Sequence, residues 1–422
     1  MPFAAHGMIH TREKTAILVL TAILFYSCQQ DYSSRPGTRE PVITRLPVMD
    51  ISCNVEDTLL QKTDEPCIIH YANQRRQVTD NEALIRLRGN STSEFPKRPF
   101  RIHLSDQTAF EGMPRAHSWA LLANWLDRTM LRTALAFRMS EDSRMDYTPR
   151  SCFIHVNYNN DSRGIYQLTE LIRESPNRLS LPENGWLAEM DIRTVPGEII
   201  FTVPHMPSPC RIRWPEMQLG DPRIAQIKAV FLQAEQALFS DNFTDKENGW
   251  RKYMDEESWV EWYVLNEIAK NNDAIFFSSC YLHSAPDGKL KMGPVWDFDM
   301  GYGNAVYFMH TDPPEGFHVR SSEWYTRLWQ DPCFRDSVRT RFEWFYNRRF
   351  EYYGFIHSKA QELLPYIVEE DSVRRMLCDK DALKEFYPDS IVAPIQAYNE
   401  EVRKLIDWTE RRFVWIKNNL PE

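Results

Sequence analysis

The stretch that most constrains the fold of this chain is GPVWDFDMGYG, residues 293–303. It places two carboxylates, Asp297 and Asp299, two positions apart. If residues 295–299 are extended, both side chains project to the same side, because side chains alternate along a strand. Two adjacent carboxylates repel each other unless a cation lies between them. Mg²⁺ or Mn²⁺ suits this arrangement, since Mg²⁺ takes one or two carboxylates and fills its other positions with water and phosphate oxygens.

A turn is the alternative interpretation of the same residues. Asp297 would then cap backbone amides, while Gly301 and Gly303 would supply positive φ angles. The residue types are compatible with both interpretations, so both stay open at this point.

Upstream, residues 267–273 read EIAKNND, where a predicted helix over residues 258–270 ends in two Asn and Asp273. A loop Asp before a hairpin that leads to metal-binding carboxylates resembles a phosphoryl-transfer site. In protein kinases one Asp orients the acceptor hydroxyl and a second holds Mg²⁺ on the phosphates. The alternative is an ordinary helix C-terminus with Asn residues in the left-handed conformation.

The composition is that of a folded protein, with 43% hydrophobic and 26% charged residues. The formal net charge is −9, and no run of Lys and Arg recurs along one face. A basic stripe of that kind is the usual mark of nucleic-acid binding. We therefore expect no nucleic-acid partner.

The first 27 residues differ from the rest, because Arg12 and Lys14 precede an apolar run over residues 15–25. This pattern predicts a signal peptide over residues 1–27, since the run is too short to span a membrane. Cys28 follows directly and resembles the lipidated cysteine of bacterial lipoproteins. A plain secretory signal with a chance Cys is the alternative. We expect an exported protein that is lipid-anchored to a bacterial membrane, with residues 28–41 as a flexible tether.

The remaining cysteines show neither CxxC spacing nor neighbouring His pairs, so they suggest no zinc site. An exported compartment permits disulfides, but an odd number without a pattern equally fits buried apolar residues. No particular bridge is predicted among Cys53, Cys67, Cys152, Cys210, Cys280, Cys333 and Cys378.

From residue 46 to residue 104 the pattern is mostly strand, which predicts an antiparallel sheet. A helix over residues 127–139 is predicted to pack on it, followed by a hairpin of residues 152–158 and 164–168. The second half is predicted to be mainly helical, with helices over residues 224–238 and 258–270. Two short strands, residues 278–283 and 290–295, interrupt it, and aromatic-rich helix extends to residue 419.

Six stretches, in this order and spacing, resemble the CotH kinase family: residues 85–92 (IRLRGNST), 96–104 (PKRPFRIHL), 119–127 (WALLANWLD), 131–137 (LRTALAF), 164–170 (GIYQLTE) and 293–299 (GPVWDFD). The resemblance implies an α+β, atypical kinase-like fold of two lobes over residues 42–420. The first lobe, about residues 42–175, would be an antiparallel sheet. The second, about residues 176–420, would be mainly helical.

The resemblance also implies an activity, the transfer of phosphate from Mg-ATP to Ser or Thr of an envelope or surface protein. Asp273 would be the catalytic Asp, and the family's Trp-Asp-x-Asp motif would make Asp297 and Asp299 ligands of Mg²⁺ or Mn²⁺. Residues of the first lobe would contact ATP; the candidates are Arg88, Asn90, Ser91, Lys97, Arg101 and Glu170. For Lys97 and Arg101 the alternative is a solvated strand face, and Glu170 could be purely structural.

The chain departs from ordinary protein kinases in several places. It has no G-x-G-x-x-G loop, and Ser278 stands where a catalytic loop would place a metal-binding Asn. Because the periplasm and the cell surface hold little ATP, the predicted export makes an inactive kinase-like scaffold that recognises an envelope protein or a glycan the main alternative function. A metal-dependent hydrolase is a third, although no His stands beside the acidic motif to activate a nucleophile.

Overall fold

The computed structural model describes residues 45–305, 309–378 and 393–421. Within this range, residues from Arg45 onward form one unit. The predicted signal peptide, Cys28 and the whole predicted tether lie outside the described residues, so export and lipid anchoring stay predictions. No helix of the described part is long and apolar enough to cross a membrane.

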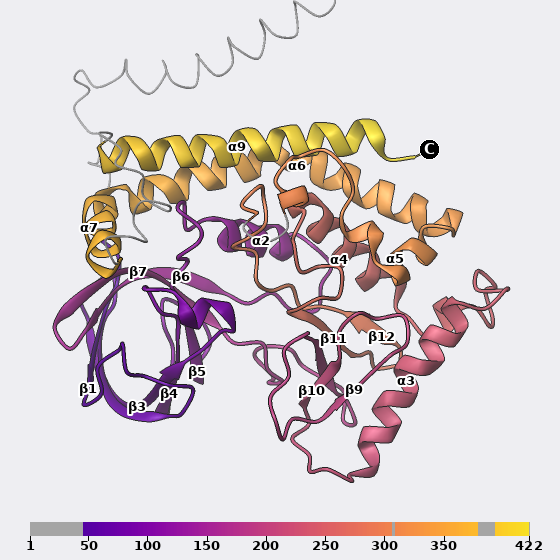
Figure 1. The fold of residues 1–422 in the computed structure, drawn as a ribbon, viewed down its shortest axis with the longest axis horizontal. Helices are drawn as coiled ribbons and strands as arrows, with labels where there is room; N and C mark the ends of the chain where they lie inside the picture. Colours follow the sequence, from indigo (N-terminus) through magenta and orange to yellow (C-terminus); the bar gives the residue numbers. More distant parts are fainter. Residues whose placement is uncertain (1–44, 306–308, 379–392, 422) are drawn as a thin grey trace, which may run out of the picture. The chain divides into compact units, whose positions relative to one another are not determined.

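The first strands form a closed barrel of seven strands (Figure 1). In spatial order they are β1 (Val48–Cys53), β2 (Glu65–Ala72), β3 (Val78–Leu87), β4 (Phe100–Thr108), β5 (Ala116–Leu122), β7 (Asp161–Glu170) and β6 (Ser151–Tyr158). Neighbouring strands are antiparallel, except that β1 pairs in parallel with β6. This parallel pair joins the two edges, so the barrel leaves no free sheet edge.

Alternation along the strands sorts the barrel residues into an inner and an outer face. In β3 and β4, Ile85 and Ile102 are fully buried and lie opposite each other in the barrel core. The next pair in the register, Arg86 and Arg101, therefore points outward, because successive side chains face opposite sides. In the β6–β7 hairpin the turn residues Asn159 and Asn160 have φ angles of 50° and 71°, as a tight hairpin turn requires.

A second, five-stranded sheet follows in the chain, in the order β12-β11-β8-β10-β9. Its strands are β8 (Leu187–Met190), β9 (Ile200–Phe201), β10 (Cys210–Trp214), β11 (Cys280–Ser284) and β12 (Leu290–Met292). All neighbours are antiparallel, and β8 lies at the centre. The β11–β12 hairpin leads directly into residues 293–303, so this sheet positions the acidic motif.

The longer helices are α2 (Arg132–Glu141), α3 (Pro222–Leu238), α4 (Glu256–Ala269), α6 (Pro332–Leu363), α7 (Ile367–Leu377) and α9 (Pro394–Asn419), with a short α5 (Glu323–Leu328). Helix α4 is central, since every residue from Ser258 to Ala269 is buried. Helices α6 and α9 pack along each other (Figure 1), and both contact α4. The aromatic residues of α4 belong to the core; the rings of Trp262 and Tyr325 stack at 5.8 Å.

The predicted class, α+β, is right, but the predicted two-lobed kinase-like fold is wrong. The first half is a closed barrel and not an open antiparallel sheet, and the second half carries a five-stranded sheet besides its helices. Alternation in sequence shows that a strand has two faces. It does not show whether the first and last strands meet, because the pairing of β1 with β6 joins residues about a hundred positions apart.

Single elements follow the predictions more closely. The predicted helix over residues 127–139 begins later, at Arg132, because the Asp127 carboxylate accepts the backbone N–H groups of Thr129 and Arg132 and forms a turn first. That helix packs against α4 and α6. Strands β5, β8, β9 and β10 were not predicted, since three of them have five residues or fewer and leave almost no periodic pattern.

Gly293 directly follows β12 and is the first residue of the acidic motif. A substitution at this position tests how tightly the motif is held. Its φ is +101°, and a Cβ atom there would lie 1.9 Å from Cε of Met145. Gly293→Ala is expected to lower the free energy of unfolding by about 2 kcal/mol, because L residues rarely adopt this φ. Urea unfolding measures the change.

The Met145 contact can be separated from the backbone strain. Met145→Ala in the Gly293→Ala background removes the contact and should recover only part of the loss. Gly354→Ala is the matched control, since Gly354 lies in α6 with open space around its Cβ position. It should stabilise the protein by about 1 kcal/mol. Equal effects of the two Gly→Ala changes would contradict a strained Gly293.

Candidate active site

Asp273 lies just past the end of α4. Lys270 caps this helix in the left-handed conformation, with φ 47°, and its N–H donates to the carbonyls of Asn266 and Glu267. The amide of Asn271 donates to Oδ1 of Asn266 at 3.1 Å. These bonds turn the chain back on the helix end, and Asp273 is only 8% exposed. The left-handed residue at this C-terminus is thus Lys270 and neither of the two Asn.

A later segment, residues 310–318, holds this turn from the other side. The backbone carbonyl of Asn272 lies 3.0 Å from Nε2 of His318, and its side-chain oxygen accepts from Thr311. The ammonium of Lys270 donates to the carbonyl of Pro313 at 2.8 Å. The loop that carries Asp273 is therefore held in place by hydrogen bonds to residues about forty positions away in the sequence.

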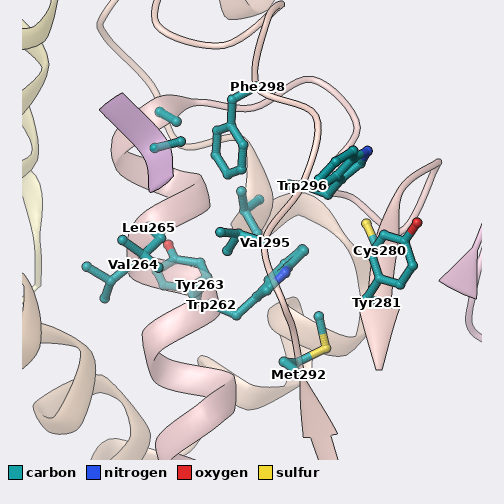
Figure 2. Packing of buried hydrophobic residues seen from close by; sticks show 14 of the residues in the cluster. Trp262, Tyr263, Val264, Leu265, Cys280, Tyr281, Met292, Val295, Trp296 and Phe298 are labelled. Atoms are coloured by element: carbon teal, nitrogen blue, oxygen red, sulfur yellow. The ribbon is translucent and has the colours of Figure 1, made fainter. Parts of the chain in front are cut away.

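The acidic motif is anchored by its apolar residues. Val295 and Phe298 are fully buried and Trp296 is 8% exposed. Figure 2 shows Val295 and Phe298 beside α4, with Trp296 on the side of Cys280 and Tyr281. The N–H of Tyr302 donates to the carbonyl of Ala269 at 2.7 Å. Packing and this hydrogen bond bring Asp297 and Asp299 to the same helix end as Asp273.

Asp297 and Asp299 lie close together, but not for the reason that the sequence suggested. Residues 295–299 are not a strand, and Asp297 has a φ of 65°, so the alternation of an extended segment does not apply. Gly303 has a positive φ, 71°, as the turn interpretation requires, but Gly301 does not. The Asp297 carboxylate accepts a hydrogen bond from the Ser279 hydroxyl at 3.2 Å. A left-handed Asp held in this way is typical of functional sites that store backbone strain.

The electrostatics show that these carboxylates lie close together with little compensation. Burial, followed by the charges of Asp297 and Asp191, raises the pKa of Asp273 to about 8. Burial also raises the pKa of Asp299 well above its usual value, and Asp297, Asp127 and Asp273 raise it further. The pKa of Asp297 is raised by burial, against the attraction of Arg88. Such a group of oxygen donors fits a hard divalent cation, which would relieve the repulsion.

No group of three or more His, Cys, Asp or Glu side chains in the described ranges is arranged to hold a metal ion by itself. One or two carboxylates remain as ligands, with the other positions left to water and phosphate. Mg²⁺ in nucleotide sites commonly binds in this way. Asp297 and Asp299 are the residues that fit this role.

Asp191, at the end of β8, belongs to the site and was not predicted. Its Oδ1 accepts from the backbone N–H of Arg193 at 2.9 Å and from the Ser278 hydroxyl at 3.1 Å. Its Oδ2 accepts from the Asn90 amide at 3.4 Å. Ser278, five residues after Asp273, thus contacts a carboxylate that directly follows β8. Only the pairing of β8 with β11 brings the two together.

Arg88 and Asn90, both predicted near ATP, reach the acidic residues from the barrel. The Arg88 guanidinium lies 5.2 Å from the centre of the Trp296 ring. Its pKa is lowered by burial, and the charge of Asp297 acts in the opposite direction. Gly89 has a φ of +84°, and a Cβ there would meet Oγ1 of Thr92 at 1.9 Å. Ser91 begins the short 3-10 helix that follows this turn.

Three predicted residues lie elsewhere. The ammonium of Lys97 is buried and donates to Glu370 of α7 at 2.6 Å and to the carbonyl of Ile165 at 2.7 Å, so it ties the barrel to a helix. Glu170 is fully buried and accepts from Arg150 at 2.8 Å, among other donors. Arg101 lies on the outer face of β4. The four carboxylates of Asp191, Asp273, Asp297 and Asp299 are called the acidic group below. None of the described contacts of Lys97, Glu170 or Arg101 is with this group.

The raised pKa values predict how Mg²⁺ acts on stability. The folded-state pKa of Asp273, about 8, exceeds the usual unfolded value near 3.9, so the folded state holds the proton more strongly. Without a cation, the contribution of Asp273 to stability is therefore fully present below about pH 4 and is lost as the pH rises from about 4 to about 8. Mg²⁺ must displace these protons at low pH, so its effect should grow across the same window.

Thermal unfolding tests this pH dependence directly. Mg²⁺ is expected to raise the Tm more at about pH 8.5 than at about pH 6, because the carboxylates are charged at the higher value. The Asp297→Asn variant should lose most of this increase. An equal Mg²⁺ effect at both pH values, or an unchanged effect in Asp297→Asn, would contradict cation binding by these carboxylates.

The comparison with known protein families supports the family that the order of the six sequence stretches suggested. The family model described as CotH kinase protein matches residues 85–416, which include the barrel strands from β4 onward, α4 and the acidic motif. No curated protein matches the chain at a significant level. Because the family match covers well over half of the sequence, the chain belongs to the CotH kinase family.

Proposed function

We propose that this protein transfers phosphate from ATP to a Ser or Thr hydroxyl of an envelope or surface protein, with Mg²⁺ or Mn²⁺ held by Asp297 and Asp299. The observation that carries the proposal is the convergence of Asp273, Asp297 and Asp299 at the end of α4. Membership of a kinase family supports use of ATP and a divalent cation in general. The identity of the metal, the acceptor and the cellular location belong to the proposal.

Each residue near the acidic group has a role that its surroundings suit. Asp273 would accept the proton of the acceptor hydroxyl, and a pKa of about 8 favours proton transfer near neutral pH. Arg88, beside Asp297, would contact phosphate oxygens, and so would the backbone and side chains of Asn90 and Ser91 in the turn. The cation, when bound, neutralises phosphate charge. Positioning and charge neutralisation supply most of the catalysis in phosphoryl transfer.

The experiment that tests the proposal is phosphate incorporation by the purified full-length chain. Labelled ATP and Mg²⁺ are added with casein and with an envelope protein fraction, and label on Ser or Thr is measured. Label is expected with the unchanged chain and not with Asp297→Asn. Asp287→Asn is the matched control, because Asp287 is an exposed Asp in the turn of the same β11–β12 hairpin. No label on any protein, or equal labelling by Asp297→Asn, would refute the kinase proposal.

A further inference from the structure

Cys53 and Cys67 face each other on the neighbouring barrel strands β1 and β2. The antiparallel register pairs them directly, at the last residue of β1 and near the start of β2. Cys53 follows the buried Ile51 by two positions and Cys67 precedes the buried Ile69 by two, so both side chains lie on the inner face of the sheet. Cys67 belongs to the barrel core, and Cys53 packs against that core.

Backbone hydrogen bonding shows how close the two residues come. The N–H of Cys53 donates to Oδ1 of Asn159 at 2.9 Å, in the turn between β6 and β7, so it points away from β2. The two cysteines are thus a non-hydrogen-bonded pair, in which the Cα atoms lie about 4.5 Å apart. A disulfide requires a Cα separation of roughly 4.4–6.8 Å. Their position in the sheet therefore suits a bond between the two sulfur atoms.

The Cys53 sulfur is also turned toward β2. Its thiol donates to the carbonyl of Pro66, the residue before Cys67, at 3.5 Å. Both thiols are free in this structure; Cys53 is half-buried and Cys67 is 6% exposed. A reagent from solution therefore reaches the sulfur of Cys53 first.

A close pair of thiols has two other ordinary roles. Structural zinc is held by four ligands, but no group of three or more His, Cys, Asp or Glu side chains within residues 45–305, 309–378 and 393–421 is arranged to hold a metal. Thiols also fill cores as small apolar groups. Core packing accounts for the buried Cys67, but it does not require a second thiol at the half-buried position opposite.

We propose that Cys53 and Cys67 form a disulfide bond when the folded protein meets a disulfide oxidant. The bond would join β1 to β2 and close residues 54–66 into a loop. The export predicted from residues 1–28 would bring the pair to an oxidising compartment, where disulfides persist. The proposal does not depend on the kinase function.

The reaction is thiol–disulfide exchange with a small disulfide RSSR, for example oxidised glutathione. The Cys53 thiolate attacks one sulfur of RSSR, which gives a mixed disulfide and one RSH. The Cys67 sulfur then attacks the Cys53 sulfur, forms the bond and releases the second RSH. The two thiols lose two electrons and two protons, and RSSR gains both. Burial and then Cys53 raise the pKa of Cys67 to about 12, so the second step should be the slower one and should speed up as the pH rises.

The segment between the two cysteines is attached to the barrel beside the turn of Arg88. The N–H of Leu87 donates to the carbonyl of Gln61 at 2.9 Å. Asp57 accepts two hydrogen bonds from Arg163, at 2.6 and 3.1 Å, and both side chains are buried. A cross-link restricts the unfolded chain more than the folded one. The oxidised protein should therefore be more stable, and this segment should open less often.

Peptide mapping of the full-length chain tests the bond directly. The folded protein is incubated at about pH 8.5, where thiolates form more readily, with oxidised and reduced glutathione. It is then quenched with acid, unfolded, alkylated and digested with trypsin. Cleavage after Lys62 leaves Cys53 in the peptide of residues 46–62 and Cys67 in that of residues 63–75. Mass spectrometry is expected to find these two peptides linked, and a reductant should separate them.

Thermal unfolding gives the second measurement. Oxidation is expected to raise the Tm by about 5 °C, because the cross-link lowers the entropy of the unfolded chain. Cys53→Ser should lose both this rise and the linked peptides. Cys333→Ser is the matched control, because Cys333 is an exposed cysteine at the start of α6, and it should keep both.

The remaining outcomes overturn the proposal. Unlinked peptides after oxidation of the folded protein do so, and so does linkage of either residue mainly to another cysteine. A Tm that stays the same or falls on oxidation also does so, since a bond that fits the native strands stabilises them. A rise in the Tm that persists in Cys53→Ser assigns the effect to other cysteines. Phosphate transfer enters none of these measurements, so they stand whether or not the kinase proposal fails.

Discussion

Asp273→Asn is expected to lower the rate of phosphate transfer by about a thousandfold, the size of effect typical of losing a general base. The carboxamide keeps the shape of Asp273 but cannot accept the proton of the acceptor hydroxyl. Incorporation of labelled phosphate into an acceptor, with the Km for ATP measured in parallel, checks this result. The Km for ATP should change little, because Asp273 is proposed to act on the acceptor.

The same substitution is expected to stabilise the folded protein above neutral pH. Burial, Asp297 and Asp191 raise the pKa of Asp273 to about 8, so the charged form destabilises the fold. Removing that charge should raise the free energy of unfolding on the order of a few kcal/mol at about pH 9, and less at about pH 6, where Asp273 is already protonated.

Urea unfolding at the two pH values measures this stabilisation, and Asp287→Asn is again the control, since its carboxylate is exposed. A loss of activity together with a gain in stability is what a residue kept for function produces. Full activity in Asp273→Asn, or lower stability at both pH values, would contradict the role proposed for Asp273.

Arg412→Met is expected to lower the free energy of unfolding by about 3–5 kcal/mol, because it breaks a buried ion pair on one side only. Arg412 on α9 is fully buried. It donates to Oε1 of Glu267 at 2.7 Å and to the carbonyls of Pro314 and Gly316 at 2.7 and 2.6 Å. Glu267 in turn accepts the N–H of His318 at 2.7 Å.

This ion pair also supports the loop of Asp273, because the segment that Arg412 holds is the one that contacts Asn272. Arg412→Met should therefore reduce phosphate transfer as well, even at temperatures where the protein stays folded. Arg411→Met is the matched control, since the neighbouring Arg411 forms an exposed pair with Glu315 at 3.2 Å. An exposed pair contributes about 0–1 kcal/mol.

A double variant separates the lost charge pairing from the lost packing. Glu267→Gln added to Arg412→Met removes the unpaired buried carboxylate and should recover part of the stability. Urea unfolding measures the free energy of unfolding of Arg412→Met, of Arg411→Met and of the double variant. Similar losses in Arg412→Met and Arg411→Met, or no recovery in the double variant, would show that the ion pair does not hold this part of the fold.

The sequence predicted local structure well where the pattern of apolar and turn residues extends over only a few neighbouring positions. Helix α4, the β6–β7 hairpin and the β11–β12 hairpin lie close to where periodicity and turn residues predicted them. The motif of residues 293–303 also identified Asp297 and Asp299 as a close pair. The cause was different, because buried Val295 and Phe298 and the left-handed Asp297 produce the arrangement and strand alternation does not.

Lys97 shows where residue type misleads. A lysine in a turn beside a candidate phosphate site suggested ATP binding, but its ammonium lies buried against Glu370, which is 273 positions away in the chain. The partner of a charge is set by the fold, and a sequence without its contacts leaves a basic residue equally compatible with a ligand or an ion pair.

By itself, the sequence determined the α+β class, most of the longer elements, the family and the acidic motif, since each depends on residues that are neighbours in the chain. Only the tertiary structure decided that the barrel closes and that Asp191 joins the acidic group. These features depend on pairings between distant strands, and such pairings are stabilised by burial of the whole core and not by any local pattern.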